Sequence, residues 1–206
     1  GDVLAGDKVG SNNLSPVISP DGRKVIFLSD KSAININLYI ARTETGEIIG
    51  RLSRKLQRQS DIDDYSYVRS AGTWSPDSRY FAFTTYQQGK NQLVIVDAQS
   101  GDIDRELDFE GLPALSNPSW SPSGEEIVVS GMRYGQSDLY VYDLENEDFR
   151  RLTDDPRSAL HPDWSPSGDR IVYVRESSDA RQVEEADWRP YEMVIYDVRS
   201  GNQEPI

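Results

Sequence analysis

The sequence has no cysteine and a single histidine among its 206 residues. Without cysteine the chain has no disulfide framework, no thiolate nucleophile and no cysteine metal site, and its redox compartment stays open. No apolar run approaches the roughly 18 residues of a membrane-spanning helix, so we expect no membrane span. Patterns typical of helices are nearly absent as well, and the apolar segments that remain are short and strand-like.

Basic charge is also scarce. The chain carries 35 acidic and 22 basic side chains, which give a formal net charge of -13. Such a surface repels phosphate backbones, so we expect no nucleic-acid partner. The basic stretch Arg51–Arg58 is interpreted as a charged sheet edge that discourages pairing with other sheets. No glycine-rich phosphate loop or cofactor motif is present, and we expect no cofactor.

One short turn phrase occurs four times along the chain. It reads ISPDG at residues 18–22, WSPDS at 74–78, WSPSG at 120–124 and WSPSG at 164–168. Its prolines, Pro20, Pro76, Pro122 and Pro166, are 44 to 56 residues apart. Proline followed by Asp-Gly or Ser-Gly is turn chemistry, so we assign the phrase a structural role and no catalytic one.

A second phrase follows each copy of the first. It reads LYIARTETG at residues 38–46, LVIVDAQSG at 93–101, LYVYDLENE at 139–147 and MVIYDVRSG at 193–201. Between the two phrases lie apolar runs such as KVIFLS and YFAFTT, which are typical of strands buried on both faces. Each repeat is therefore predicted to form a four-stranded antiparallel sheet.

Four-stranded repeats of this length are the pattern of a β-propeller, in which each sheet is one blade. One blade cannot bury both of its apolar faces alone, whereas neighbouring blades can. We therefore predict an all-β fold with blades at about residues 14–55, 68–110, 115–155 and 159–206. In this interpretation Trp74, Trp120 and Trp164 pack between blades as large apolar side chains rather than stacking on a ligand.

The Trp-Ser-Pro turn, the apolar strand and the Leu-Tyr-Val-Tyr-Asp phrase resemble the WD40-like (PD40-type) repeats of TolB-type β-propellers. The resemblance covers all four units, from about Leu14 to the C-terminus. More loosely, the pattern is similar to the propeller of prolyl oligopeptidase family enzymes. The first unit departs from the others, with Ile18 in place of tryptophan and Ala41 in place of Asp97.

The resemblance carries several expectations. TolB-type rings have six blades and hydrolase-linked rings commonly seven or eight, so four repeats imply part of a larger ring. A closed four-bladed ring and a ring completed by self-association with a second copy are the alternatives. The resemblance also implies a bacterial protein of the periplasm or cell envelope, and a cytoplasmic location stays open.

Two insertions point to a functional end of the blades. Relative to the other units, about ten extra residues fall in the connection after the first blade and about ten in the second turn of the fourth. Both are expected at the same end, where loops on a rigid scaffold commonly bind partners. The candidate binding residues in these insertions are Tyr65, Tyr67, Trp188, Arg189 and Tyr191, whose types dominate interface hot spots. The alternative is that they fold back over their own loops.

His161 is the other candidate binding residue, because it begins an innermost strand and is expected to border the central channel. A Ser-His-Asp triad would have to use this histidine, but no Gly-x-Ser-x-Gly elbow accompanies it, so a structural role is favoured and no catalytic residue is assigned. The acidic run Asp61–Asp64 lacks the spacing of a calcium loop, and no metal site is assigned.

Two hypotheses about function follow. In the first, this chain is a non-catalytic module that binds a protein or peptide through the long-loop end and channel mouth of a TolB-like propeller. In the second, it is the substrate-gating propeller of a larger peptidase whose catalytic domain lies elsewhere. Both predict no enzymatic activity from these residues alone, and the activity of a longer protein stays open.

Overall fold

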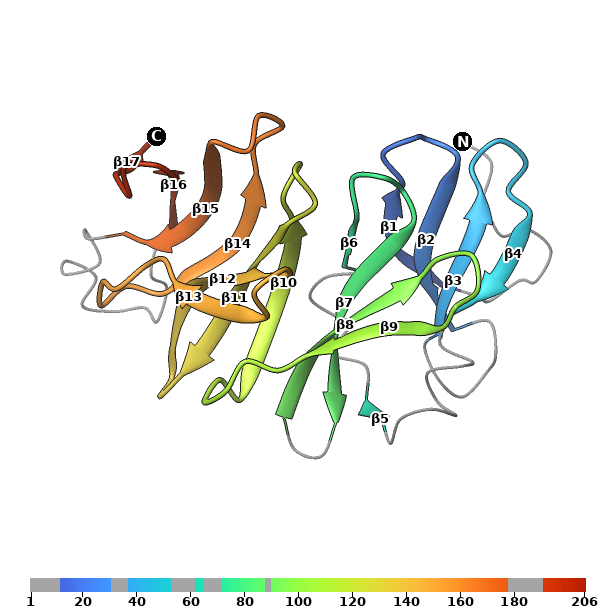
Figure 1. Ribbon diagram of the computed structural model, residues 1–206, viewed down its shortest axis with the longest axis horizontal. Coiled ribbons are helices and arrows are strands. Elements are labelled where there is room, and N and C mark those ends of the chain that lie inside the picture. Colours follow the sequence, from blue (N-terminus) through green and yellow to red (C-terminus); the bar gives the residue numbers. More distant parts are fainter. Residues whose placement is uncertain (1–11, 31–36, 53–61, 65–71, 88–89, 178–190) are drawn as a thin grey trace. The chain divides into compact units, whose positions relative to one another are not determined.

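The computed structural model describes residues 12–30, 37–52, 62–64, 72–87, 90–177 and 191–206. Every regular element in these ranges is a strand, and none contains a helix long and apolar enough to cross a membrane. The chain divides into two compact units, Gly1–Asp108 and Phe109–Ile206. Each unit holds two antiparallel sheets, which confirms the predicted all-β fold with four-stranded blades (Figure 1).

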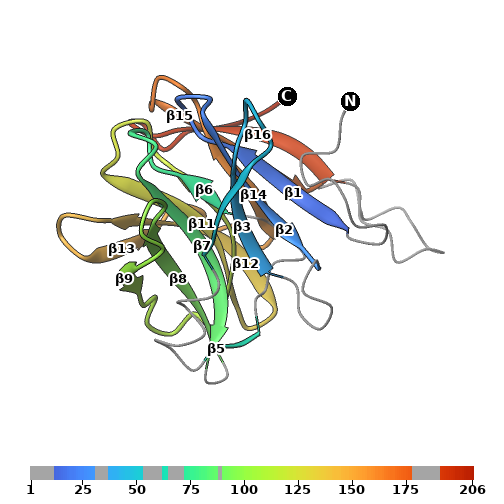
Figure 2. The same ribbon diagram turned by 90° about the vertical axis from the view of Figure 1, so that its right-hand side faces the viewer.

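The first unit contains the first two sheets. Sheet one consists of β1 (Asn13–Ile18), β2 (Lys24–Ser29), β3 (Asn37–Arg42) and β4 (Ile48–Arg51), paired in chain order (Figure 2). Sheet two consists of β5 (Ile62–Asp64), β6 (Thr73–Trp74), β7 (Tyr80–Gln87), β8 (Lys90–Asp97) and β9 (Ile103–Leu107). The first strand of sheet two is split, because β5 and β6 both pair with β7 at different positions. The sequence did not predict the short strand β5, which falls within the proposed insertion.

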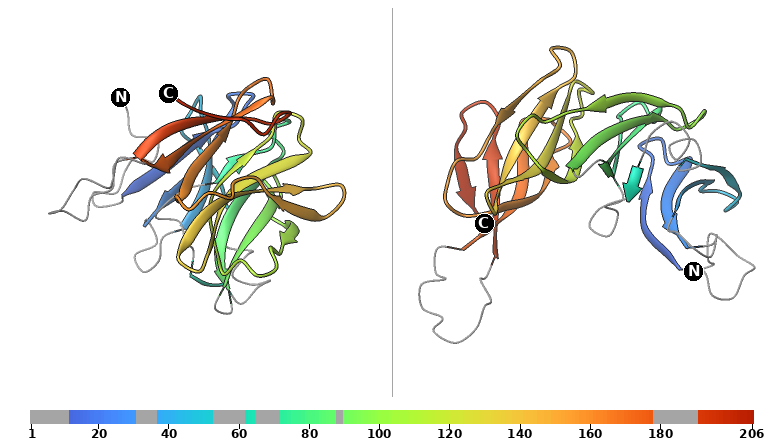
Figure 3. Two further views of the ribbon diagram at one scale, coloured as in Figure 1. Left: turned by 90° about the vertical axis from the view of Figure 1, so that its left-hand side faces the viewer. Right: turned by 90° about the horizontal axis from the view of Figure 1, so that it is seen from below.

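The second unit contains the last two sheets, again in chain order (Figure 3). Sheet three consists of β10 (Ala114–Trp120), β11 (Glu126–Arg133), β12 (Gln136–Asp143) and β13 (Asp148–Arg151). Sheet four consists of β14 (Ala159–Trp164), β15 (Arg170–Glu176), β16 (Tyr191–Asp197) and β17 (Gln203–Pro205).

The serine of each Ser-Pro phrase closes the hairpin between the first and second strands. Its hydroxyl accepts a hydrogen bond of 2.8 to 3.1 Å from the backbone N–H five residues later, at Ser19, Ser75, Ser121 and Ser165. Proline fixes the next backbone angle, and Gly22, Gly124 and Gly168 adopt the positive φ that ends the turn. The local sequence therefore dictates the same turn in all four sheets.

The core of the first unit lies between its two sheets. Ile26 and Ile40 of sheet one pack with Trp74, Phe81 and other apolar side chains of sheet two in one buried cluster. The Trp74 indole N–H donates to the carbonyl of Val17, at 3.0 Å, and its ring meets that of Phe81 edge-on with centroids 5.5 Å apart. Trp74 thus joins neighbouring sheets.

The core of the second unit is built in the same way. Trp164, Tyr173 and Val194 of sheet four pack with Val128 and Leu139 of sheet three. The tryptophan of sheet three differs, since Trp120 is only partly buried and its indole N–H donates to the carbonyl of Gly124 in its own turn, at 3.1 Å.

Strand pairing corrects one detail of the repeat. Asp97 and Asp143 lie opposite the first residue of the preceding strand, and in sheet one the residue at that place, opposite Lys24, is Arg42. The equivalent of Asp97 is therefore Arg42 and not Ala41. The assignment of Ala41 to this place was wrong by one residue, since the repeated phrases that begin at Leu38 and Leu93 also have Arg42 and Asp97 as their fifth residues.

The aspartates at this position cap the turn between the third and fourth strands. The Asp143 and Asp197 carboxylates accept backbone hydrogen bonds of 2.8 to 2.9 Å. The bonds from the Asn146 and Ser200 amides hold the pKa of these two carboxyls below the usual range. In sheet one the turn between the third and fourth strands forms without an aspartate cap, and Arg42 occupies the position of the aspartate.

Candidate functional site

In each sheet the turns alternate between two ends, because the strands follow one another in chain order. The Ser-Pro turn and the third turn lie at one end. The turn between the second and third strands lies at the other end, where the chain also passes to the next sheet. We call the latter the turn-two end. In the second unit it comprises the β11–β12 hairpin, residues 152–158, and the adjoining ends of β15 and β16.

The structure places two of the six candidate binding residues. His161 lies on β14 with its side chain exposed, and Tyr191 is the first residue of β16, with 57% of its surface exposed. β15 separates the strands of these two residues, so they do not form one cluster. The remaining four, Tyr65, Tyr67, Trp188 and Arg189, lie outside the described residues, as does Asp61 of the acidic run.

His161 occupies a β-bulge that recurs in the first strand of three sheets. Ser15, Asn117 and His161 all have φ near +50° and each precedes a proline. In each strand the pairing register shifts at this place, so two residues oppose one. The positive φ of His161 therefore follows from a repeated backbone feature.

The β11–β12 hairpin presents an aromatic residue at the turn-two end. Tyr134 and Gly135 form its two-residue tip, both with positive φ, which is the backbone of a type I′ turn. Asparagine usually occupies the first of these positions, because a larger side chain is strained there. Tyr134 is 93% exposed, and the Arg133 guanidinium lies 5.1 Å from the centre of its ring. The tip thus displays an aromatic ring and a cation side by side.

A pocket of about 430 Å³ opens beside this tip. It is lined by Arg133, Tyr134, Gln136, Asp138, Tyr140, Phe149 and Arg151. Its wall is aromatic, because the rings of Tyr140 and Phe149 meet edge-on with centroids 6.0 Å apart. Gly131 makes room for this wall, since a Cβ there would lie 2.8 Å from the Tyr140 ring.

A buried carboxylate lies within the same pocket. Asp138 accepts hydrogen bonds from Arg151 at 2.7 Å and from the Thr153 hydroxyl at 3.1 Å. Burial raises the pKa of the Asp138 carboxyl above its usual value, and these two hydrogen bonds offset the rise only in part. Burial, and then the negative charge of Asp138, also raise the pKa of the Tyr140 hydroxyl.

A network of four charged side chains supports the same end. Arg175, on β15, has a side chain only 7% exposed, and it contacts Glu192 of β16 at 2.8 Å and Asp155 at 3.1 Å. Arg157 contacts the same two carboxylates, at 3.1 and 2.7 Å. Gln203 of β17 accepts from Arg175 at 3.1 Å, which extends the network to the last strand.

The network holds the end of β15 and the start of β16 in place. The insertion of sheet four connects these two strand ends. Arg175 lies one residue before the end of β15, and Glu192 is the second residue of β16. The Gln136 side chain, beside the Tyr134 tip, donates to the backbone carbonyl of Asp155 at 2.5 Å. The hairpin, the connection and the strand ends therefore form one hydrogen-bonded support.

Sequence reasoning proposed the turn-two end as the binding end, but it did not name Arg133, Tyr134 or the other pocket residues as candidates. The sequence contains one signal for the exposed tyrosine. In RYGQ, residues 133–136, Tyr134 directly precedes a glycine, and a residue before glycine commonly forms the tip of a two-residue turn. The charged network had no such signal, because its members are scattered over residues 155 to 192. Among the residues that the structure describes, no three histidine or acidic side chains group as a metal site.

Repeated antiparallel sheets of four strands joined by the same Ser-Pro turn define a β-propeller protein. The sequence profile described as the TolB beta propeller domain matches residues 56–193. This chain belongs to that family.

Individual relatives agree with this assignment. The chain is 29% identical over 142 residues to the Tol-Pal system protein TolB of Ruthia magnifica subsp. Calyptogena magnifica, a match that covers 63% of this chain and 32% of the relative. It is 28% identical over 121 residues to the uncharacterized peptidase YuxL of Bacillus subtilis, covering 56% of this chain and 16% of YuxL. The chain therefore spans about a third of the length of its TolB relative.

A solved structure shows the same fold. The putative TolB from Agrobacterium tumefaciens superposes with a TM-score of 0.74 at 21% sequence identity. The superposition covers 98% of this chain and 66% of that one.

Proposed function

We propose that this chain is a non-catalytic module that binds a protein or peptide, and that the turn-two end of the second unit is its binding surface. The observation that carries the proposal is the exposed Tyr134 ring, which stands with Arg133 beside an aromatic pocket. Tyrosine and arginine supply much of the energy in protein interfaces when a partner covers them. The hydrogen-bonded network around Arg175 already holds this end in place, so little conformational entropy is lost when a partner binds.

The insertion residues extend this proposed surface. Trp188 and Arg189 belong to the segment between β15 and β16, and Tyr191 begins β16 at the same end. Tyr65 and Tyr67, in the insertion of the first unit, are proposed to bind a partner at the turn-two end of that unit. His161 is proposed to border the channel mouth, as the resemblance to TolB-type propellers implies.

The relatives favour a role in the cell envelope. Several are named Tol-Pal system proteins, which supports a function in a system of several components. We accordingly propose a periplasmic or envelope-associated location. The partner is expected to be a protein or a peptide segment, since the pocket has the size and aromatic lining that suit one or two side chains.

The test uses peptides selected from a random phage-displayed library on the intact protein, followed by affinity measurements with the synthetic peptides. Tyr134→Ala is expected to weaken binding about 30-fold, the size of a hot-spot loss. Glu145→Ala, an exposed change at the opposite end of the same sheet, is expected to leave the affinity unchanged.

Two further variants locate the surface more finely. Tyr191→Ala tests the insertion side and His161→Ala tests the channel mouth. Unchanged affinity in all three variants, with circular dichroism showing intact folding, would contradict a binding surface at this end.

A second candidate function rests on the match to a peptidase. The resemblance to part of YuxL favours a propeller that gates substrate for a catalytic domain in a longer protein. An antibody against this chain would measure the mass of the native polypeptide in its source cells. A mass explained by two to four additional blades, about 90 to 180 residues, supports the binding module. A further excess of about 100 to 250 residues supports an attached domain, as the peptidase hypothesis requires.

A further inference from the structure

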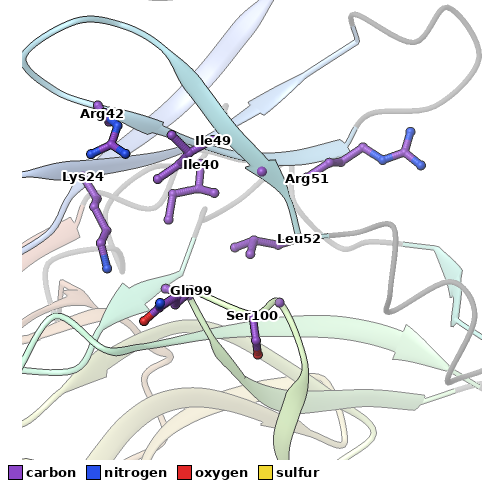
Figure 4. A pocket seen from close by; sticks show the side chains of 11 residues that line it. Lys24, Ile40, Arg42, Ile49, Arg51, Leu52, Gln99 and Ser100 are labelled. Atoms are coloured by element: carbon purple, nitrogen blue, oxygen red, sulfur yellow. The ribbon is translucent and has the colours of Figure 1, made fainter.

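A second pocket, of about 540 Å³, lies between the two sheets of the first unit. It is lined by residues of β2, β3 and β4 and by the turn at Ala98–Gly101 (Figure 4). The volume is in the range of small-molecule sites. Figure 4 shows the Arg51 side chain directed away from the pocket, so Arg51 does not count among its ligand-binding groups.

Two cations mark one end of this pocket. Lys24 begins β2 and lies opposite Arg42, so both side chains project from the same face of the sheet, which is also the face of Ile40. In Figure 4 Lys24 extends toward the turn that carries Gln99. Among the described residues, the Lys24 ammonium has no hydrogen bond or ion pair. The charge of Lys24 helps to lower the pKa of the Asp21 carboxyl, but within the described residues no carboxylate forms a direct ion pair with its ammonium.

Arg42 is available to a ligand as well. Its only ion pair within the described residues is with Glu47 at 3.1 Å, and both side chains are more than 60% exposed. Such an exposed pair contributes little and exchanges readily with other anions. In the other three sheets this position is aspartate, so the charge at the repeat position is reversed only here.

The middle of the pocket is apolar, because the pairing of β3 with β4 turns an isoleucine toward it. Ile40 lies opposite Gly50 and Ala41 opposite Ile48, so Ile49 is the extra residue of a β-bulge, and it is 41% exposed. Bulges re-aim side chains in this way. Sheet two has the same bulge in β9, but there the extra residue is Asp104.

Gly50 keeps the centre of the pocket open. A Cβ at that position would lie only 3.0 Å from the Cγ2 of Ile40, so any larger residue would crowd the floor. Leu52 continues the apolar surface, and Gln99 and Ser100 contribute polar side chains on the facing turn (Figure 4).

We propose that this pocket binds an organic carboxylate with an apolar body. The carboxylate lies between Lys24 and Arg42, where two cations can bind it with charge-assisted hydrogen bonds. The apolar body lies over Ile49 and Leu52, which removes an exposed isoleucine from water. This ligand site is separate from the peptide surface proposed for the second unit and does not depend on it.

The test is a titration of the intact protein with octanoate, followed by methyl NMR signals of Ile40, Ile49 and Leu52. We expect binding with a Kd of about 1 mM or lower. Octanol lacks the carboxylate of octanoate, and acetate lacks its apolar chain. Each is therefore expected to bind at least about tenfold more weakly than octanoate. Equal binding of octanoate and octanol, or no shift of these methyl signals, would overturn the proposal.

Matched variants separate the site from general charge effects. Lys24→Met is expected to weaken octanoate binding about fivefold. Arg170→Met removes a cation at the equivalent position of sheet four and is expected to change nothing. Ile49→Asp places a carboxylate in the pocket and should abolish binding, and the fold should tolerate it because Asp104 occupies the equivalent bulge in sheet two. Unchanged affinity in Lys24→Met would also overturn the proposal.

The source of the carboxylate is distinguished by a second ligand pair. Acetyl-Leu-Leu with a free C-terminal carboxylate is compared with its C-terminal amide in the same titration. The free acid of acetyl-Leu-Leu is then compared with octanoate. Tighter binding of the peptide acid identifies a peptide C-terminus as the natural ligand, and tighter binding of octanoate identifies a fatty-acid-like ligand. Either result supports the proposed carboxylate and apolar body.

Discussion

Arg175→Met is expected to lower the free energy of unfolding by about 3 kcal/mol, because two partly buried carboxylates then lose their buried cationic partner. Glu192 and Asp155 both contact Arg175, at 2.8 and 3.1 Å, and Arg157 alone cannot balance two negative charges. Methionine retains most of the side-chain volume, so the loss reports on charge rather than on a cavity. Urea unfolding followed by circular dichroism measures it.

The size of this loss depends on pH in a defined direction. Burial by itself would raise the pKa of Asp155, but the hydrogen bonds and charge of Arg157, with the charge of Arg175, outweigh it and hold the pKa below its ordinary value of 3.8. A carboxyl with a lowered pKa in the folded state stabilises the fold above its unfolded-state pKa, and the effect disappears as the pH falls through the folded-state pKa. The difference between the wild type and Arg175→Met should be largest near neutral pH and shrink below 3.8.

Two control variants test whether the loss in Arg175→Met comes from the burial of its ion pairs. Arg150 and Glu126 form a pair of the same length, 2.8 Å, but the Arg150 side chain is 51% exposed, so Arg150→Met should cost less than about 1 kcal/mol. The double variant Arg175→Met/Glu192→Met leaves the Asp155–Arg157 pair balanced and should recover at least half of the loss. Equal costs for Arg175→Met and Arg150→Met would show that the network adds nothing beyond a surface ion pair.

Trp74→Ala is expected to cost about 4 kcal/mol, because it leaves a large cavity between the two sheets of the first unit. The ring packs on Phe81 within a cluster that includes Ile26 and Ile40 of the neighbouring sheet. The substitution also leaves the Val17 carbonyl without the indole donor it has at 3.0 Å. Denaturant unfolding gives the total, and amide hydrogen exchange should show lost protection in β2, β3, β7 and β8.

The matched control is the equivalent tryptophan of sheet three. Trp120 is only partly buried, and its indole N–H bonds within its own turn, so Trp120→Ala should cost no more than about 2 kcal/mol. A similar loss in both variants would mean that the repeat position, rather than packing between sheets, sets the energy.

The two stability variants also bear on function. The Arg175 network lies at the turn-two end, so Arg175→Met should weaken selected peptides that depend on the insertion between β15 and β16. Trp74 lies in the other unit and should leave those peptides unaffected while loosening the walls of the carboxylate pocket. Binding data on the same two proteins therefore distinguish the two proposed sites.

The repeat in the sequence was sufficient to predict the fold class. Ser19 and its three counterparts form the same hydroxyl-to-backbone hydrogen bond, because six consecutive residues contain all of its atoms. The apolar runs after the first and third Ser-Pro turns are buried strands, as their length and continuous apolar composition indicate. Information of this kind is local, and each unit of the repeat confirms the others.

The candidate site was predicted less completely. The turn-two end follows from counting residues between repeats, but Tyr134 becomes a candidate only when the hairpin register makes it the tip of a two-residue turn. The choice of Ala41 as the counterpart of Asp97 was wrong by one residue, and the pairing of Arg42 with Lys24 confirms that a cation replaces the repeated aspartate. A shift of one residue moves a side chain to the other face of a strand, so register decides which groups meet.

The sequence by itself determined the four-stranded repeat, its turns, the strongly acidic charge and the absence of cysteine chemistry, because these depend on composition and on contacts within a few residues. Tertiary structure alone decided which side chains of the neighbouring sheet Trp74 and Trp164 contact, how Arg175 meets carboxylates from separate segments, and where a bulge exposes Ile49 beside Lys24. These features require residues far apart in the chain to lie within a few ångströms of one another. Their positions are set by strand register and packing, which local sequence patterns specify only in part.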